Sequence, residues 1–297
     1  AAAAACEAGA PTLAAMGVLY VVATPIGNLE DLTARAARVL ASVPVVAAED
    51  TRRTRKLLNH IGASPRLIAY HADSPERRED AIVACLREGD VALVSDAGTP
   101  GLADPGPDLV ARVRREGMSV VPIPGASALA TALSVVSFAQ QPVTFIGFLP
   151  ERRPRRERLV RRAAAVARTL VIYLPPHRAA ARVAELLEWL GDCPAAMCRE
   201  LTKLHEDIRE MPLSELCVVL TDDAPRGEIT LVIDVAEREP VSEPEASNIA
   251  SAVTAALASG ASPAQAAAAV ARELRVPRRE VYALVQELRR GDSGESS

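Results

Sequence analysis

The chain has 297 residues, of which 49% are hydrophobic and 24% are charged, and its formal net charge is -4 at pH 7. This composition excludes a disordered chain, and the small net charge excludes a polycation that binds any nucleic acid it meets. The length is enough to bury a large core and suits two modest domains better than one.

The cysteines and the lack of long apolar runs indicate in which cellular compartment the protein is expected. The five cysteines include no Cys-x-x-Cys pair, which argues against a disulfide framework and a structural zinc site and favours free thiols in a reducing cytoplasm. No apolar run approaches the roughly 20 residues of a membrane span. The four histidines show no metal-ligand spacing. We therefore expect a cytoplasmic protein without a membrane partner or a metal ion.

The first domain is expected over residues 18–138, after a disordered, alanine-rich leader formed by residues 1–17. Short apolar runs alternate here with helical patterns, in which Asn28 can cap a first turn and Gly62 and Gly117 stand where helices should end. This alternation predicts an α/β domain with a mostly parallel sheet. The expected strands are residues 18–24, 43–49, 66–70, 91–95 and 119–124.

A second α/β domain is expected over residues 139–239. The strand pattern restarts at "PVTFIGFLP", and "EDIREM" follows "AAMCRE" without a crossover helix, which predicts an antiparallel component. From residue 240 to the end we expect a linker and a small helical extension. In this extension Ser262 and Gln265 form a capping-box pattern, and Pro277 can start another helix.

Several expected strands end in loops rich in glycine and proline, namely residues 24–29, 49–56, 95–106 and 124–129. Ligands of open α/β sheets bind outside the carboxyl ends of the strands, and such loops form rigid cradles that a ligand can approach closely. No G-x-G-x-x-G or Lys-Ser/Thr phosphate loop is present, which disfavours nucleoside triphosphates and dinucleotides. A ligand with an adenosine, an amino acid moiety and a positive centre suits the loops, although composition alone does not choose it.

The motifs "VATPIGNLEDLTARA", "AAEDTRRTRKLL", "VSDAGTPGLADPG", "VPIPGASALATAL", "FIGFLP", "PHR", "RELTKLHE" and "RGE" follow one another along the chain. In this order and spacing they resemble the ribosomal small-subunit 2'-O-methyltransferase I family, which belongs to the tetrapyrrole (corrin/porphyrin) methylase superfamily. The resemblance implies two α/β domains with S-adenosylmethionine in the cleft between them, usually in a homodimer. It also implies methylation of a cytidine 2'-hydroxyl in the decoding region of 16S rRNA, with the small ribosomal subunit as partner.

The resemblance also implies where the cofactor binds. Residues 96–99 and 124–127 resemble the cofactor-binding segments of the superfamily, and the first-strand loop faces the cleft. Two positions depart from the family pattern, because Leu174 and Ile146 stand where glutamates are expected. The cofactor-binding residues implied are Thr24, Pro25, Gly27, Asp96, Ala97, Gly98, Thr99, Pro124, Gly125, Ala126 and Ser127.

Transfer of a methyl group to a 2'-hydroxyl needs a group that accepts or delocalises the hydroxyl proton. Glu49, Asp50, Glu200 and an unusually shifted Lys203 are the alternatives. We favour Glu200 with Lys203, held on one short segment beside Arg199.

Contacts with RNA are expected from local basic stretches, because the forked guanidinium of arginine suits phosphate. With only eight aromatic residues in the chain, a stacking platform for single strands is not expected, which favours a structured RNA. Two other functions stay open: methylation of a small tetrapyrrole, and a non-catalytic role in ribosome assembly. The expected RNA-binding residues are Arg52, Arg53, Arg55, Arg152, Arg153, Arg155, Arg156 and Arg158.

Overall fold

The structure is a computed structural model, and it describes residues 17–71, 76–222, 226–236, 246–273 and 281–286. The chain divides into two compact units, residues 1–236 and 237–297, and each is described here by itself. The leader, most of the linker and the helix start expected at Pro277 lie outside the described residues.

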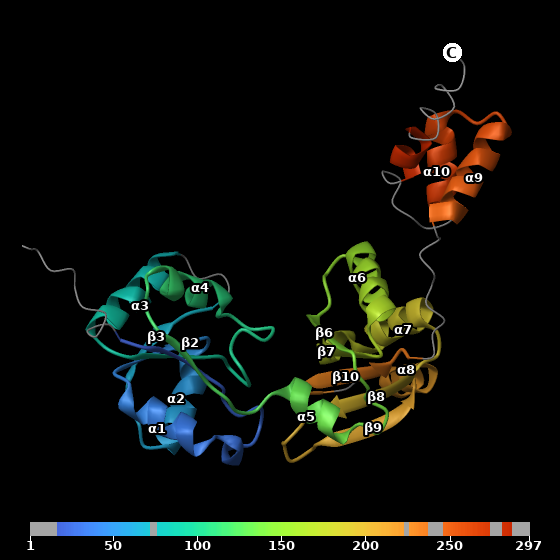
Figure 1. The fold of residues 1–297 in the computed structure, drawn as a ribbon. Coiled ribbons are helices and arrows are strands. Elements are labelled where there is room, and N and C mark those ends of the chain that lie inside the picture. The colour runs from blue at the N-terminus through green and yellow to red at the C-terminus, as the bar shows by residue number, and fades with distance from the viewer. Residues whose placement is uncertain (1–16, 72–75, 223–225, 237–245, 274–280, 287–297) are drawn as a thin grey trace, which may run out of the picture. The chain divides into compact units, whose positions relative to one another are not determined.

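The first sheet of the larger unit is parallel throughout, which agrees with the mostly parallel sheet that was predicted. Its strand order is β3-β2-β4-β1-β5. Figure 1 shows helices α1 and α2 on one face of this sheet and α3 and α4 on the other, with an apolar core on each side. The strands are β1 (Leu19–Val22), β2 (Val45–Ala48), β3 (Arg66–Ala69), β4 (Val91–Val94) and β5 (Val120–Ile123), and the helices are α1 (Ala34–Ser42), α2 (Thr51–His60), α3 (Glu76–Glu88) and α4 (Pro107–Arg115).

The first helical pattern forms a short 3-10 turn followed by an α-helix. The Asn28 side chain caps only a short 3-10 turn, η2 (Leu29–Asp31), by accepting from the Glu30 N–H at 3.0 Å. Leu32 and Thr33 are extended, and the Thr33 hydroxyl accepts from the Ala36 N–H at 3.1 Å to start α1. A second capping residue five positions after the first therefore restarts the helix.

The second sheet is mixed, and the predicted antiparallel component is confirmed. Its order is β6-β7-β10-β8-β9, in which only the pair β6 and β7 is parallel. Figure 1 shows helices α6, α7 and α8 on one face, where the largest apolar core lies. The elements are β6 (Val143–Phe148), α6 (Arg153–Val166), β7 (Thr169–Leu174), η3 (Pro176–Arg178), α7 (Ala179–Leu190), β8 (Pro194–Arg199), β9 (Asp207–Pro212), α8 (Leu213–Asp222) and β10 (Ile229–Asp234).

Helix α5 (Ala128–Val135) covers the other face of the second sheet. Its buried Ala132 belongs to one apolar cluster with Val171 of β7 and Val232 of β10. The helix thus packs with the second sheet, although it precedes the boundary expected near residue 138. It follows β5 directly, so it connects the two halves of this unit.

The smaller unit contains α9 (Ala246–Ala258) and α10 (Pro263–Glu273). Val253, Val270 and Val285 belong to its own apolar core. The capping box is present at the start of α10, because the Ser262 N–H donates to Gln265 Oε1 at 2.9 Å and the Gln265 N–H donates to Ser262 Oγ at 3.4 Å. Within the described ranges, no helix has the length and apolar character needed to cross a membrane.

Candidate functional site

The loops that follow β1 and β4 are joined by backbone hydrogen bonds. The Thr24 N–H donates to the Gly98 carbonyl at 2.8 Å, and the Gly98 N–H donates to the Thr24 carbonyl at 3.0 Å. The buried Thr24 hydroxyl donates to the Ser95 carbonyl at 3.3 Å. Gly98 has a φ of 78°, a left-handed conformation that favours glycine. These contacts join two of the predicted ligand loops into one surface.

The loop after β5 lies against the same surface. A Cβ atom at Gly125 would lie 3.0 Å from the Ala23 Cβ, so the absence of a side chain lets the two backbones approach this closely. The Thr99 hydroxyl donates to the Ala126 carbonyl at 3.2 Å. The three loops that carry the predicted cofactor residues therefore lie side by side.

The loop after β2 is tied to this surface through Asp96. The Asp50 N–H donates to Asp96 Oδ1 at 2.8 Å, and the Asp96 N–H donates to Glu49 Oε2 at 3.2 Å. The Asp50 carboxylate caps α2 and pairs with Arg52, whose hydrogen bonds lower the pKa of Asp50 to about 2. Both carboxylate oxygens of Asp50 already accept hydrogen bonds from Arg52 in this structure, which disfavours Asp50 as the proton acceptor. Its role in this structure is to fix the start of α2.

A loop of the second sheet reaches the same place. Residues 200–206 follow β8, and the Thr202 hydroxyl accepts from the Asn28 N–H at 3.2 Å. A Cβ atom at Gly27 would lie 2.4 Å from Lys203 Cγ, so glycine at position 27 makes room for the lysine stem. The site therefore contains residues from both sheets.

Lys203 and Glu200 form a hydrogen-bonded ion pair. Lys203 Nζ lies 2.8 Å from Glu200 Oε1 and 3.1 Å from Glu228 Oε2, and the Glu228 N–H donates to Glu200 Oε1 at 2.8 Å. Burial works against both charges, but these hydrogen bonds outweigh it, so the pKa of Glu200 is lowered and that of Lys203 is raised. Lys203 is thus held as an ammonium group in this structure, contrary to the idea that it accepts a proton.

Arg199 forms an ion pair with Asp207 of the neighbouring strand. Its guanidinium lies 3.3 Å from Asp207 Oδ2 on β9, while its Nε is buried without a hydrogen-bond partner. Among the described residues Arg199 makes no hydrogen bond or ion pair with Glu200 or Lys203, although its charge contributes to lowering the pKa of Glu200.

These loops enclose a cavity of about 350 Å³, within the size range of small-ligand pockets. Its wall combines the β1 and β4 loops with one side of α2 and with Lys203 and Glu228. A second cavity of about 290 Å³ is lined by Gly125, Ala126 and Thr202, among others. The lining residues of the first are Thr24, Pro25, Ile26, Gly27, Leu29, Arg53, Thr54, Lys56, Leu57, Ser95, Asp96, Ala97, Lys203 and Glu228.

Asp104 and Glu228 were not among the site residues expected from sequence, and Lys56 was expected only as part of a basic stretch that contacts RNA. Burial, with a contribution from the Glu49 charge, raises the pKa of Asp104 to about 6, and a hydrogen bond with Ser95 opposes this rise. Lys56 and Glu228 line the first cavity. All three lie inside the quoted motifs, "GLADPG", "TRRTRK" and "RGE". The motifs therefore indicated this region but not which of its charged residues belong to the site.

The two departures from the family pattern lie in the core of the second sheet. Leu174 is 2% exposed, and both Leu174 and Ile146 pack in the apolar cluster under α6, α7 and α8. A carboxylate at either position would be surrounded by apolar side chains, which disfavours its charged form. In this chain the two positions therefore serve packing.

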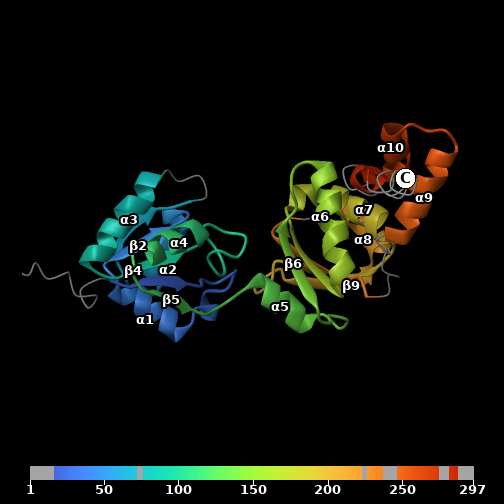
Figure 2. The same ribbon diagram turned by 45° about the horizontal axis from the view of Figure 1, so that its top comes forward.

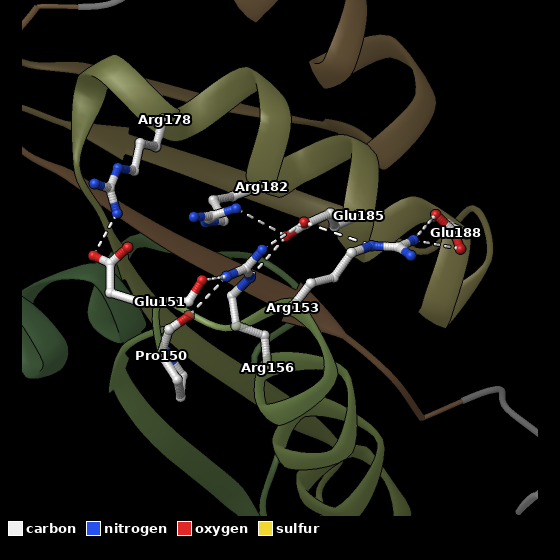
Figure 3. A network of polar contacts seen from close by, with 8 residues as sticks. All are labelled: Pro150, Glu151, Arg153, Arg156, Arg178, Arg182, Glu185 and Glu188. Atoms are coloured by element: carbon white, nitrogen blue, oxygen red, sulfur yellow. Dashed lines mark hydrogen bonds and ion pairs between the residues drawn. The ribbon is translucent and has the colours of Figure 1, made fainter.

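The basic helix α6 is anchored to α7 by ion pairs (Figure 3). Arg156, which is 4% exposed, lies 2.7 Å from Glu185 and donates to the carbonyls of Pro150 and Glu151. Arg182 joins Glu185 at 3.1 Å. Because its guanidinium is fully engaged beneath the helix, Arg156 is removed from the expected RNA-binding set.

The other expected RNA-binding arginines differ in whether an ion pair already holds their guanidinium group. Arg153 lies 2.6 Å from Glu188 and over the Trp189 ring, and Arg52 is bound to Asp50 although 89% of its side chain is exposed. Arg53 lies 3.5 Å from Asp96. The exposed positions without such an ion pair, within the part of the chain that the structure describes, are Arg55, Arg152, Arg155 and Arg158.

The described residues contain no group of three or more histidine, cysteine, aspartate or glutamate side chains that could hold a metal ion. Their four cysteines are free, and Cys193 and Cys198 are buried. The polar groups of the site are thus carboxylates, ammonium and guanidinium groups, hydroxyls and backbone.

A model of the family described as Tetrapyrrole (Corrin/Porphyrin) Methylases matches residues 18–217. The "Ribosomal RNA small subunit methyltransferase I" of Synechocystis sp. is 40% identical over 275 residues, which cover 92% of this chain and 99% of that protein. The protein of the same name from Bacillus subtilis is 38% identical over 272 residues, covering 90% of this chain and 93% of that protein.

Solved structures share the fold. The uroporphyrin-III C-methyltransferase of Thermus thermophilus, solved with S-adenosyl homocysteine, has a TM-score of 0.52 at 21% identity, covering 73% of this chain and 97% of that one. This likeness establishes the two-sheet architecture of the larger unit.

Proposed function

The chain belongs to the tetrapyrrole (corrin/porphyrin) methylase family, and from this premise we propose that it methylates ribosomal RNA with S-adenosylmethionine as methyl donor. The acceptor we propose is the 2'-hydroxyl of a cytidine in the decoding region of 16S rRNA, within the small ribosomal subunit. The observation that carries this proposal is the 40% identity, over nearly the whole length of both chains, to a protein named for methylation of small-subunit RNA.

The cradle of loops fits S-adenosylmethionine. Residues 96–99 and 124–127 are mostly small, and the lack of a side chain at Gly125 lets this loop pack closely against Ala23. We propose that these two segments hold the adenosine and amino acid moieties. When bound, the cofactor supplies a methyl group on a positively charged sulfur, which makes that methyl group electrophilic.

The ion pair beside the cavity supplies the proton chemistry in this proposal. A ribose hydroxyl is a poor nucleophile while it is protonated, so its proton must pass to a base. Glu200 is ionised and fixed by Lys203 and by the Glu228 N–H. If the substrate draws the Lys203 ammonium away, the pKa of Glu200 rises toward its ordinary value, because a hydrogen bond that stabilised the carboxylate is lost. Glu200 then accepts the proton, and the Lys203 ammonium stabilises the negative charge on the oxygen.

The decisive experiment measures methyl transfer from labelled S-adenosylmethionine to small ribosomal subunits from cells that lack this gene, with the modified nucleoside identified by mass spectrometry. The proposal expects 2'-O-methylcytidine. Label in a small tetrapyrrole instead of RNA would assign the other activity of the superfamily. RNA binding without any methyl transfer would assign a non-catalytic role in ribosome assembly.

The exposed arginines of α6 and of its N-cap give a second test, which separates RNA binding from cofactor binding. Changing Arg152, Arg155 and Arg158 together to Gln should raise the KM for small subunits at least about tenfold, since each lost phosphate contact weakens binding. The Kd for S-adenosylmethionine should not change. A matched triple variant, with the exposed Arg35, Arg38 and Arg114 changed to Gln, controls for loss of positive charge. Equal loss of RNA and cofactor binding would contradict the assignment of α6 to RNA.

We further propose a homodimer and a cytoplasmic location. The first is implied by the resemblance to the family, and the second follows from the proposed ribosomal substrate. Sedimentation velocity of the purified chain tests the dimer, because a mass near 31.4 kDa would indicate a monomer.

A further inference from the structure

The chain has two lysines, and both line the same cavity. Of its 34 lysine and arginine residues, only Lys56 and Lys203 are lysines, and both belong to the wall of the 350 Å³ cavity. Arginine and lysine are not interchangeable: an ammonium is a compact point charge on a flexible stem, whereas a guanidinium is a planar fork. This chain has arginine at nearly every cationic position, and the ammonium groups of its two lysines both lie at this cavity.

The two lysines differ in their partners. Lys203 is bound to Glu200 and Glu228. The Lys56 ammonium, by contrast, has no hydrogen bond or ion pair with any residue that the structure describes. Its charge is therefore available to a ligand without breaking an internal contact.

Helix α2 presents Lys56 to the cavity from a fixed position. Arg53 and Lys56 are three residues apart, which places them on the same side of the helix. Thr54 and Leu57 also line the cavity, and both are buried. The Asp50 cap and its backbone hydrogen bond to Asp96 tie the first turn of the helix to the β4 loop.

The charges around the cavity favour an anionic ligand near α2. The wall contains two carboxylates, Asp96 and Glu228, and both already have cationic partners, Arg53 at 3.5 Å and Lys203 at 3.1 Å. Lys56 is therefore the cation whose charge no wall carboxylate offsets. An RNA nucleotide has a phosphodiester on each side of its ribose, and phosphate contacts position the chain without reading its bases.

We infer that Lys56, with Arg53 beside it, binds a backbone phosphate next to the methylated nucleotide and so positions the acceptor ribose at the cavity. This inference rests on the proposed function and adds to it a positioning residue that is separate from Glu200 and Lys203. The role is electrostatic and geometric, and no bond is made or broken at Lys56.

The test compares Lys56→Met, Lys56→Arg and the control Arg38→Met, an exposed cation on α1, in methyl transfer to small ribosomal subunits. Lys56→Met should raise KM about tenfold, the effect of one lost charge-assisted hydrogen bond, with kcat and the Kd for S-adenosylmethionine nearly unchanged. The slope of log kcat/KM against log salt concentration should become shallower by roughly 0.7 to 0.9, the contribution of one phosphate contact. Lys56→Arg should recover most of the slope and part of KM, and Arg38→Met should change neither.

Several results would overturn the inference. If the natural chain methylates RNA and Lys56→Met has the same KM and salt slope, Lys56 binds no phosphate, although the proposed function stands. A lower kcat with an unchanged slope would place Lys56 in folding or chemistry instead. If the natural chain transfers no methyl group to RNA, the proposed function fails, and filter binding of labelled 16S rRNA decides on Lys56 alone: equal affinity and salt slope for Lys56→Met overturn its role.

Discussion

Glu200 and Thr202 adopt left-handed backbone conformations, with φ of 51° and 67°, although neither is glycine. Such a conformation costs roughly 1–3 kcal/mol per residue and persists only where surrounding contacts impose it. Here the contacts are the Lys203 ammonium on Glu200 and the Asn28 N–H on the Thr202 hydroxyl. The strained turn thereby brings a carboxylate and an ammonium to the loop after β1.

Gly27 tests this arrangement without touching a charged group. In Gly27→Ala the new Cβ would lie 2.4 Å from Lys203 Cγ and 3.1 Å from the Leu201 carbonyl oxygen, so residues 201–203 must move. Since small displacements of catalytic groups reduce rates steeply, we expect methyl transfer to fall by about 10²-fold. The melting temperature should fall as well, because the displaced segment includes the buried Leu201.

The matched control is Gly89→Ala, in which the nearest atom lies 3.6 Å from the new Cβ. It should leave methyl transfer and melting temperature unchanged. Equal activity of Gly27→Ala and the natural chain would show that the position of Lys203 does not matter for catalysis.

Asp104 predicts a dependence of stability on pH. Burial raises its pKa from 3.8 to about 6, so the folded chain holds this proton more tightly than the unfolded chain does. The stability associated with the proton is complete below pH of about 4 and is lost as pH rises through about 6. At pH 7 the charged carboxylate of Asp104 therefore destabilises the folded chain.

Asp104→Asn should remove this destabilising charge while keeping a hydrogen-bond acceptor for Ser95. We expect the variant to be more stable than the natural chain by about 1 kcal/mol at pH 7, after allowance for solvent screening. The difference should vanish near pH 4. Urea unfolding midpoints at both pH values measure it, and a variant that is less stable at pH 7 would contradict the assigned burial effect.

At the scale of elements, α6 and α7 lie side by side in both views (Figures 1 and 2), and ion pairs join them. Arg156 and Glu185 are largely buried, with side-chain exposures of 5% and 16%, whereas the side chain of Glu188 is 61% exposed. A buried pair that loses one partner leaves an uncompensated charge, whereas an exposed pair contributes little. The two glutamates, three residues apart on one helix, therefore make a matched comparison.

Glu185→Ala should lower the free energy of unfolding by about 3 kcal/mol, and the melting temperature by roughly 6–12 °C, because Arg156 stays buried without its carboxylate. Glu188→Ala should cost less than about 1 kcal/mol. Thermal unfolding followed by circular dichroism distinguishes them. Similar losses of stability in both variants would mean that the buried pair contributes no more than the exposed pair to holding α6 and α7 together.

At the scale of the whole molecule, the two units have separate cores. The four apolar clusters of the larger unit end at Val235, and the cluster of the helical unit begins at Val253. We therefore expect a chain that ends at residue 236 to fold by itself and to bind S-adenosylmethionine with the affinity of the full chain. Isothermal titration measures this, and a truncated chain that fails to fold or to bind the cofactor would contradict the independence of the units.

The strands were predictable because their signal is local. Each of the five expected strands of the first domain contains a strand of the structure, from β1 to β5, since a buried parallel strand is an uninterrupted apolar run. The cap at Asn28 is confirmed, but the first turn that it caps does not continue into α1. A short 3-10 turn and a restart at Thr33 depend on which of two nearby capping residues the packed chain uses.

The sequence alone determined the class of fold and the family and predicted the ligand loops, because hydrophobic periodicity, glycine and proline positions and ordered motifs all lie along the chain. Only the tertiary structure decided which charged side chains are available. It bound Asp50 to a helix cap, buried Arg156 beneath α6, paired Lys203 with Glu200 and gave Lys56, at the cavity, no partner among the described residues. Arg156 and Glu185 are 29 residues apart, so sequence spacing carries no record of their pairing, whereas the Asp50–Arg52 and Glu200–Lys203 contacts are local. Burial and pairing arise only when the sheets and helices pack, and these decide the charge and reach of each group.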